Sequence, residues 1–275
     1  MKLKIFFLAA FLLNIFLSIA QVKTVSESQF DIGEIKTIQS KILNERRILN
    51  IYLPPTYVKE KAYPVIYLLD GSANEDFLHI VGLVQFYNMQ YQMPDFIVVG
   101  IANVDRKRDF TFPTDAPDLK KEFPTTGSSA KFISFVESEL QPYIQSKYST
   151  TDTKYIIGQS LGGLLAMEIL LKKPQLFTHY LIVSPSLWWD NESLIKNAPT
   201  LLEQSKNTTA EVYIAVGMKE HITMIKDAKD MSIAFRNAKN PKVRVDFMEM
   251  PNENHASILH QSISDIFRKK FPLKE

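Results

Sequence analysis

The chain has no cysteine among its 275 residues, so no disulfide bond stabilises the fold and the hydrophobic core must do so alone. It also has little net charge, with 32 basic against 30 acidic residues. The sequence contains no basic patch that would predict a nucleic-acid partner and no acidic tail that would predict a basic partner. Low-complexity stretches and solenoid-type repeats are missing as well, which argues against flexible linkers and against a repeat protein.

The first twenty residues predict a secretory signal peptide. Lys2 and Lys4 precede an almost wholly apolar run over 5–17, and Ser18-Ile19-Ala20 places small residues before a cleavage site. We expect cleavage after Ala20, a periplasmic or secreted protein, and no stable membrane anchor afterwards. The alternative is a retained N-terminal anchor, for which the apolar run is shorter than the ~20 residues that span a bilayer. Since no cysteine follows, anchoring through a lipid-modified cysteine is excluded.

Residues 21–275 are predicted to form a single domain, because their length suits one large core. Alternating runs within 22–54 predict antiparallel strands at a sheet edge. Apolar runs typical of buried strands follow. They lie at 65–69, 96–101, 155–157, 180–183 and 212–216, with a less apolar one at 243–247 near the far edge. Helical periodicity is found at 76–90, 129–147, 161–172, 192–204, 223–237 and 256–270.

This alternation predicts an α/β fold with a mostly parallel central sheet, helices on both faces, and antiparallel N-terminal edge strands. Functional residues of such sheets gather at the carboxyl ends of the strands.

A G-x-S-x-G motif, Gly158-Gln159-Ser160-Leu161-Gly162, stands between a short β-type run and an apolar helical run. Glycine is only 9 of 275 residues, against a usual share of about 7%, yet three glycines fall within 158–163. A serine on a sharp strand-to-helix turn is the nucleophile elbow of an α/β hydrolase, so Ser160 is the predicted nucleophile. The alternative is a tight turn with an idle serine.

Serine is a weak nucleophile and needs a base within hydrogen-bond reach. In the α/β-hydrolase order the acid follows the serine and the histidine comes last. His255 lies in a polar loop between the final strand and the final helix, where the base belongs. His260 falls inside the helical run and is interpreted as a surface or packing residue.

The acid that orients the histidine is expected just after the second strand beyond the elbow. That strand is 212–216, which makes Glu220 the predicted acid. Asp190, after the preceding strand, and Glu253, near the histidine in sequence, are the rivals. A serine–histidine dyad without any carboxylate is a further alternative.

An oxyanion hole needs two backbone N–H donors. Leu161, directly after the nucleophile, is predicted to supply one. The second is expected from the turn after the strand at 65–69, with Ser72 preferred and Gly71 next. An ordinary turn at this place is the alternative.

Motifs for metal ions or nucleotides are missing. No His-x-x-x-His spacing or Walker loop is present, and 158–163 does not fit G-x-G-x-x-G. We therefore expect no metal and no cofactor.

Three segments carry a family resemblance: Asp70-Gly71 after a buried strand, Gly-Gln-Ser-Leu-Gly-Gly at 158–163, and Ser-Pro-Ser-Leu-Trp-Trp-Asp at 184–190. The chain resembles the putative-esterase branch of the α/β hydrolases over about residues 45–270. That branch includes esterase D, feruloyl and acetylxylan esterases, the mycolyltransferases and siderophore trilactone esterases. The third segment is most similar to the periplasmic siderophore-esterase-like group. The resemblance implies ester hydrolysis but does not identify the ester, and the acid member varies in that group.

Four residues are predicted to bind substrate. Trp188 and Trp189, near a strand end, are expected to stack on an aryl group or a sugar ring, with core packing as the alternative. Arg106 and Arg108 are expected to meet an anionic, catecholate-like substrate, with a surface pair to aspartate as the alternative.

Together these features predict an exported serine esterase that forms an acyl-enzyme on a small-molecule ester. An acyltransferase of the same fold and a catalytically silent binding protein are the alternatives.

Overall fold

The computed structural model describes residues 24–275, and the predicted signal peptide at 1–20 lies outside the described residues. Gly33–Glu275 forms one compact unit. The unit that begins at Gly33 is described by itself below.

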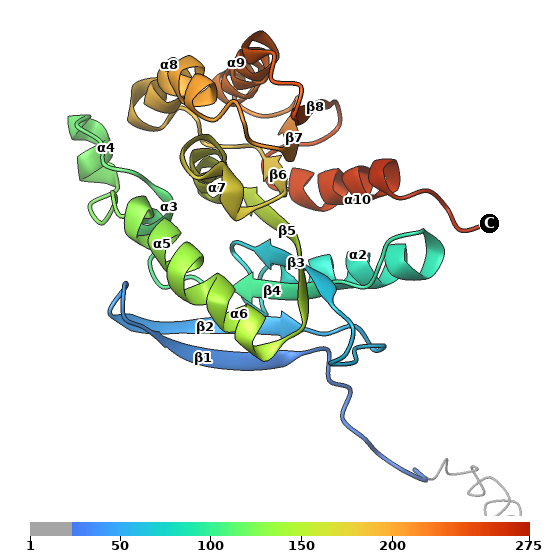
Figure 1. Cartoon of the computed structure of the whole chain (residues 1–275). Helices are drawn as coiled ribbons and strands as arrows, with labels where there is room; N and C mark the ends of the chain where they lie inside the picture. Colours follow the sequence, from blue (N-terminus) through green and yellow to red (C-terminus); the bar gives the residue numbers. More distant parts are fainter. Residues whose placement is uncertain (1–23) are drawn as a thin grey trace, which may run out of the picture. The chain divides into compact units, whose positions relative to one another are not determined.

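A single eight-stranded sheet runs through this unit in the order β1-β2-β4-β3-β5-β6-β7-β8 (Figure 1). The first two strands pair antiparallel with each other, and β2 pairs antiparallel with β4, whereas all other neighbours are parallel. The strands are β1 (Glu34–Ser40), β2 (Glu45–Tyr52), β3 (Tyr63–Leu68), β4 (Ile97–Ile101), β5 (Thr150–Gln159), β6 (His179–Val183), β7 (Ala210–Gly217) and β8 (Val243–Met250). The predicted mostly parallel sheet with antiparallel N-terminal edge strands is confirmed.

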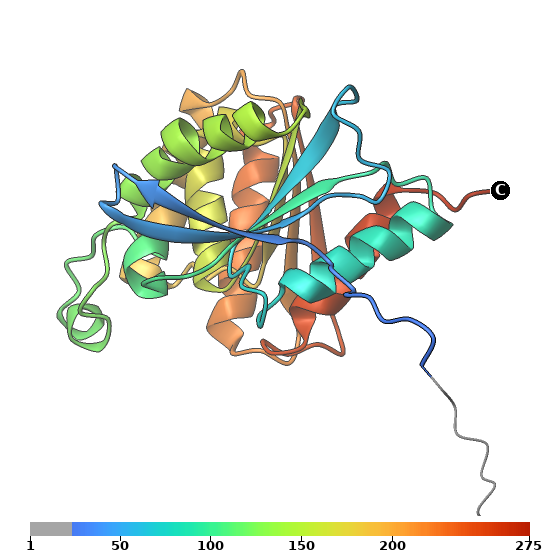
Figure 2. The ribbon, with the colours of Figure 1, turned by 90° about the horizontal axis from the view of Figure 1, so that it is seen from below.

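Helices cover both faces of the sheet, because successive strand residues point to opposite sides. Ile66 and Leu68 of β3 join a core cluster with α2 (Phe77–Gln90) and α10 (Ile258–Lys270), which lie side by side (Figure 2). Val65 and Tyr67 join the cluster on the other face. The other face carries α5 (Ser129–Phe135), the π-helical turn η1 (Val136–Leu140), α6 (Gln141–Lys147), α7 (Leu161–Lys172), α8 (Trp189–Gln204) and α9 (Ile222–Ala238), with the 3-10 turn η2 (Pro174–Leu176) between α7 and β6.

Two short helices were not expected from the sequence: α3 (Arg106–Phe110) and α4 (Pro117–Glu122). Five or six residues are too few to show a helical period, so periodicity cannot identify them. The Asp105 side chain caps α3 by accepting a hydrogen bond from the backbone N–H of Arg108 at 3.0 Å. Helix α8 also begins earlier than predicted and is interrupted at 190–192, where three residues have positive φ.

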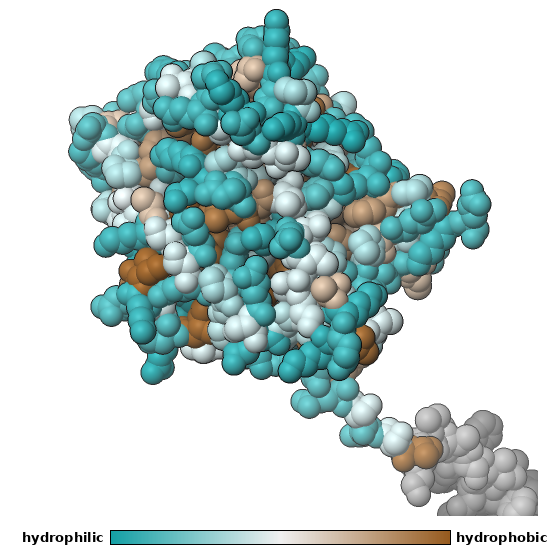
Figure 3. All heavy atoms as spheres, in the orientation of Figure 1, coloured by the Kyte–Doolittle hydropathy of each residue, from teal (hydrophilic) through white to brown (hydrophobic). Residues whose placement is uncertain are grey.

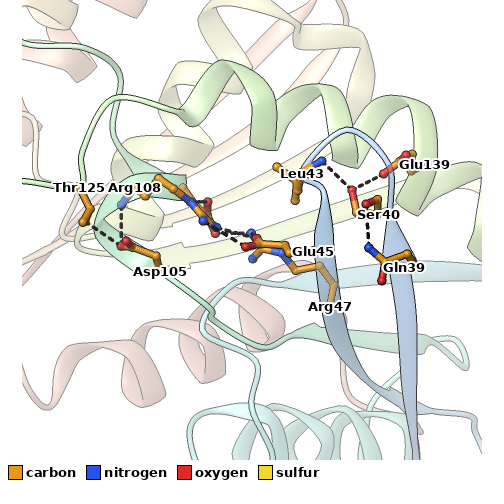
Figure 4. Close-up of polar contacts among 10 residues, drawn as sticks. Gln39, Ser40, Leu43, Glu45, Arg47, Asp105, Arg108, Thr125 and Glu139 are labelled. Atoms are coloured by element: carbon orange, nitrogen blue, oxygen red, sulfur yellow. Dashed lines mark hydrogen bonds and ion pairs between the residues drawn. The ribbon is translucent and has the colours of Figure 1, made fainter.

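Paired charges attach α3 to β2 (Figure 4). The Arg47 guanidinium of β2 lies 2.6 Å from the Asp109 carboxylate, and both side chains are 1% exposed. Arg108 donates to Glu45 at 2.6 Å and to Asp109 at 2.8 Å. Because a buried charge is costly unless it is paired, these four side chains hold each other in place. The strand-end loop that follows β4 is thereby fixed to β2.

The face seen in Figure 3 is mostly hydrophilic with small separate hydrophobic patches, which is ordinary for a folded domain. Among residues 24–275, no helix is both long enough and apolar enough to cross a bilayer.

The turn from β5 into α7 brings two backbones into contact. A Cβ built on Gly158 would lie inside 3.0 Å of the carbonyl oxygen of Gly162, so no side chain fits there. Gly82, on the exposed side of α2, has nothing within 4 Å of a built Cβ. The two glycines therefore form a matched pair for substitution.

We expect Gly158→Ala to lower the free energy of unfolding by roughly 2 kcal/mol or more, because a backbone atom blocks the added methyl group. Gly82→Ala should raise that free energy by about 0.5–1 kcal/mol, since alanine is the better helix residue. Urea denaturation followed by circular dichroism measures both. Equal stabilities for the two variants would contradict the close approach at the turn.

Candidate active site

Ser160 occupies the turn between β5 and α7 in a strained conformation, with φ 60° and ψ −120°. A non-glycine residue rarely adopts positive φ, and such strain is typical of functional sites. The backbone N–H of Ser160 donates to the Val183 carbonyl at 3.1 Å, which ties the turn to the end of β6. Leu161 begins α7, so its N–H belongs to the free end of the helix beside the serine.

A histidine and a carboxylate pair at the ends of the last two strands. His255 Nδ1 lies 2.7 Å from Glu220 Oε2. The Glu220 side chain is 1% exposed and that of His255 is 47% exposed. The Gln159 side-chain amide donates to the His255 carbonyl oxygen, which joins the histidine loop to the residue before Ser160. Part of the imidazole is thus exposed to solvent, while its Nδ1 is bound by Glu220.

Glu220 is held as a carboxylate by several donors. Ser184 Oγ donates to Oε1, and the backbone N–H of Gly217 donates to the same oxygen at 2.8 Å. Burial by itself raises the pKa of the Glu220 carboxyl, but the hydrogen bonds from His255, Ser184 and Gly217 outweigh it and hold that pKa below its ordinary value. A charged Glu220 is therefore available to stabilise an imidazolium on His255.

The two rival acids lie elsewhere. Asp190 Oδ1 accepts from Thr114 Oγ1 at 2.7 Å, and Glu253 Oε2 accepts from Ser257 Oγ at 2.6 Å. Of the three carboxylates considered from the sequence, Glu220 is the one that contacts His255. His260 lies in α10, where its ring stacks on His79 at 3.7 Å, as expected for a surface or packing residue.

An open cavity of about 440 Å³ lies at the carboxyl ends of the strands. It is lined by Asp70, Glu75, Asp76, Arg106, Gln159, Ser160 and His255. The predicted nucleophile and base thus share one cavity. Ser160 Oγ forms a 3.3 Å hydrogen bond with Ser186 Oγ. The hydrogen bond between a nucleophile and its base often reaches its short distance only once substrate is bound.

Of the two backbone N–H groups expected as donors in the turn after β3, one is firmly bonded within the protein and the other only weakly. Gly71 N–H donates to the Ile101 carbonyl at 3.0 Å, so the expectation that Gly71 is an oxyanion donor is corrected by the structure. Ser72 N–H lies 3.4 Å from Glu75 Oε2, a long contact that a stronger acceptor can replace. Leu161 and Ser72 remain the predicted pair.

Among residues 24–275, no group of three or more His, Cys, Asp and Glu side chains is arranged to hold a metal ion.

A family model described as Putative esterase matches residues 40–272. The chain belongs to this esterase family. The ferri-bacillibactin esterase BesA of Bacillus subtilis (strain 168) is 30% identical over 258 residues, which cover 86% of this chain and 88% of BesA. The family resemblance expected from the sequence is confirmed.

Solved structures agree with this assignment. The BES protein from Bacillus cereus superposes with a TM-score of 0.79 at 28% identity, covering 90% of this chain and 98% of its own. An IroE-like serine hydrolase from Shewanella oneidensis gives 0.74 at 31% identity, covering 87% and 80%. The α/β-hydrolase fold is therefore confirmed, and the protein is an esterase of the serine-hydrolase type.

Two arginines predicted to bind substrate are engaged within the esterase itself. Arg106 lines the cavity, but its Nε and Nη2 donate to the two carboxylate oxygens of Asp70 at 2.7 and 2.9 Å. Arg108 is directed to Glu45 and Asp109 and does not line the cavity (Figure 4). The expectation for Arg108 is corrected: an acidic partner on β2 draws its guanidinium away.

The two tryptophans differ from each other. Trp189 is 0% exposed and its indole N–H donates to the Phe112 carbonyl at 2.9 Å, so the expectation that Trp189 stacks on substrate is corrected to core packing. Trp188 is partly buried against the same core, with its ring centroid 6.3 Å from that of Phe123. It does not line the cavity that holds Ser160.

Sequence reasoning missed two side chains that touch the site. Ser184 contacts Glu220 and Ser186 contacts Ser160, whereas the sequence pattern at 184–190 indicated only a family subgroup. Their position directly after β6 was the signal that could have identified them, since functional residues gather at strand ends.

We expect Glu220→Gln to lower kcat at least on the order of 10²-fold, because an amide cannot stabilise the imidazolium and favours the wrong tautomer. Asp190→Asn is the matched control, a carboxylate to amide change one strand away, and should keep kcat within about twofold. Steady-state hydrolysis of p-nitrophenyl acetate measures both. If neither change matters, the esterase works as a serine–histidine dyad, and if Asp190→Asn is the more damaging, the acid was misassigned.

Proposed function

We propose that this protein is an exported serine esterase that cleaves siderophore-type esters through an acyl-enzyme on Ser160. The supporting observation is that Ser160 and His255 line one cavity, while Glu220 forms a hydrogen bond with Nδ1 of His255. No other carboxylate among those considered reaches the histidine.

In the proposed first step, Ser160 Oγ attacks the ester carbonyl carbon and its proton passes to His255 Nε2. The N–H groups of Leu161 and Ser72 hold the oxyanion that forms. Collapse of the tetrahedral intermediate breaks the ester C–O bond, and His255 returns the proton to the departing alcohol. Water then attacks the acyl-enzyme by the same route, which releases the acid and restores Ser160.

The cavity supports a polar ester over a long aliphatic one. Four of its seven lining residues are charged, so an acyl chain would find little apolar wall. Asp70 and Arg106 neutralise each other, which leaves Glu75 and Asp76 as the other charged residues of the lining. We therefore expect the iron-free form of a catecholate trilactone, which carries less negative charge, to be cleaved at least as fast as its iron-loaded form.

Export is proposed from the N-terminal pattern of basic, apolar and small residues at 1–20. After expression of the full chain in a bacterium, the protein recovered outside the cytoplasm should begin with Gln21. N-terminal sequencing checks this, and recovery of the uncleaved chain in the membrane fraction would contradict it.

A panel of esters tests the substrate class. We expect kcat/KM for a catecholate trilactone to exceed that for feruloyl, acetyl-sugar and p-nitrophenyl acetate esters by about tenfold or more, because a larger substrate contributes more binding energy to the transition state. Product analysis should show free acid and alcohol. A preference for p-nitrophenyl palmitate would overturn the substrate class.

Ser160→Ala is the control for the whole proposal. It should lower kcat/KM on every active ester on the order of 10³-fold and abolish labelling by a fluorophosphonate, since the catalytic residues act as a unit. The melting temperature should stay near that of the parent. Activity within about threefold of the parent would overturn Ser160 as nucleophile.

A further inference from the structure

The turn Ser184-Pro185-Ser186, directly after β6, touches the proposed catalytic residues at both ends. Ser184 Oγ donates to Glu220 Oε1, and Ser186 Oγ lies 3.3 Å from Ser160 Oγ. The proline separates two hydroxyls that reach two different members of the site.

The backbone of this turn is fixed to the same elements. Ser184 N–H donates to the Ala215 carbonyl of β7 at 2.8 Å, and Ser186 N–H donates to the Ser160 carbonyl at 3.0 Å. Ser184 has φ 42°, a conformation that is costly for serine. The two side chains are 0% and 2% exposed. Such strain and burial persist only where the surrounding contacts hold them.

Gly163 of α7 shows how close the turn lies to the nucleophile. A Cβ built on it would meet the Val183 carbonyl oxygen at 2.9 Å and Pro185 Cα at 3.0 Å. The turn thus packs directly on the first residues of the helix that follows Ser160, and its position cannot change without moving the elbow.

We propose that Ser184 and Ser186 are positioning residues: Ser184 holds the Glu220 carboxylate toward His255, and Ser186 orients the Ser160 hydroxyl. This inference rests on the proposed function. The Ser-Pro-Ser turn then acts as one rigid link between the acid and the nucleophile.

Ser186 acts through the hydrogen bond to Ser160 Oγ. Both groups are hydroxyls, so either can donate in the resting enzyme. When Ser186 donates, the Ser160 proton is free to point toward His255, and Ser186 stays as a donor to Oγ while that proton leaves. Loss of this donor lowers the fraction of Ser160 hydroxyls that are correctly oriented. It therefore lowers kcat and does not change substrate binding.

Ser184 acts through Glu220. It occupies Oε1 together with the Gly217 N–H, which leaves Oε2 for His255 Nδ1. Without Ser184 the carboxylate loses one of the two hydrogen bonds that Oε1 accepts. The loss of kcat caused by removing the Ser184 hydroxyl should therefore require the Glu220 carboxylate to be present.

Ser186→Ala tests the first hydrogen bond. We expect kcat to fall about five- to tenfold with KM unchanged, and the second-order rate of fluorophosphonate labelling to fall by the same factor. Ser232→Ala is the matched control: Ser232 is 1% exposed and its hydroxyl donates to a backbone carbonyl in α9 at 2.9 Å. It should leave kcat and labelling within twofold.

Ser184→Ala tests the second hydrogen bond through a double-mutant cycle. In the parent it should lower kcat about fivefold, whereas in the Glu220→Gln background it should lower kcat less than twofold, because the carboxylate on which it acts is gone. Equal losses in both backgrounds would overturn the role of Ser184.

If Ser186→Ala does not fold, Ser186→Cys keeps a side chain of similar size with a weaker donor, and its kcat should lie about two- to tenfold below that of the parent. A kcat and labelling rate within twofold of the parent, for a folded Ser186 variant, would overturn the role of Ser186. That outcome leaves the proposed function standing if Ser160→Ala is inactive, whereas an active Ser160→Ala would remove the proposed function itself.

Discussion

Helix α7 approaches the sheet so closely at the turn after β5 that the geometry of the whole site follows from this contact. The backbones of Gly158 and Gly162 lie too close together for a Cβ on Gly158, and Ser160 between them has positive φ. Because the strand and the helix are in contact, the serine stands at the end of the helix with free N–H groups beside it. A bulkier turn would move the nucleophile away from both the helix end and the histidine.

Polar groups at the neighbouring strand ends are satisfied by one another across that turn. Glu220 from the end of β7 accepts from Ser184 after β6 and from His255 after β8. Gln159, next to the nucleophile, donates to the His255 carbonyl. Since a buried polar group without a partner is costly, each loop stabilises the conformation of the next. The acid, the base and the nucleophile are thus held by one continuous network.

Charge pairing decides which cationic groups face the cavity. Arg106 is bound by Asp70 and also donates to the Gln159 carbonyl at 3.1 Å, so it joins the turn after β3 to the elbow. Arg108, two residues later, is drawn to Glu45 on β2. The short helix α3 therefore separates two similar side chains: Arg106 lines the cavity, whereas Arg108 belongs to a partly buried ion network and does not line it.

The strands, the long helices, the elbow at Ser160 and the loop positions of Glu220 and His255 could be predicted from the sequence, because buried strands, glycine spacing and chain order are local properties. Which carboxylate contacts the histidine depends on tertiary contacts, since Asp190 and Glu220 both follow strands and differ in what surrounds them. Tertiary packing likewise placed Trp189 in the core. Burial and hydrogen-bond partners are set by elements far apart in the chain, so no local pattern predicts them.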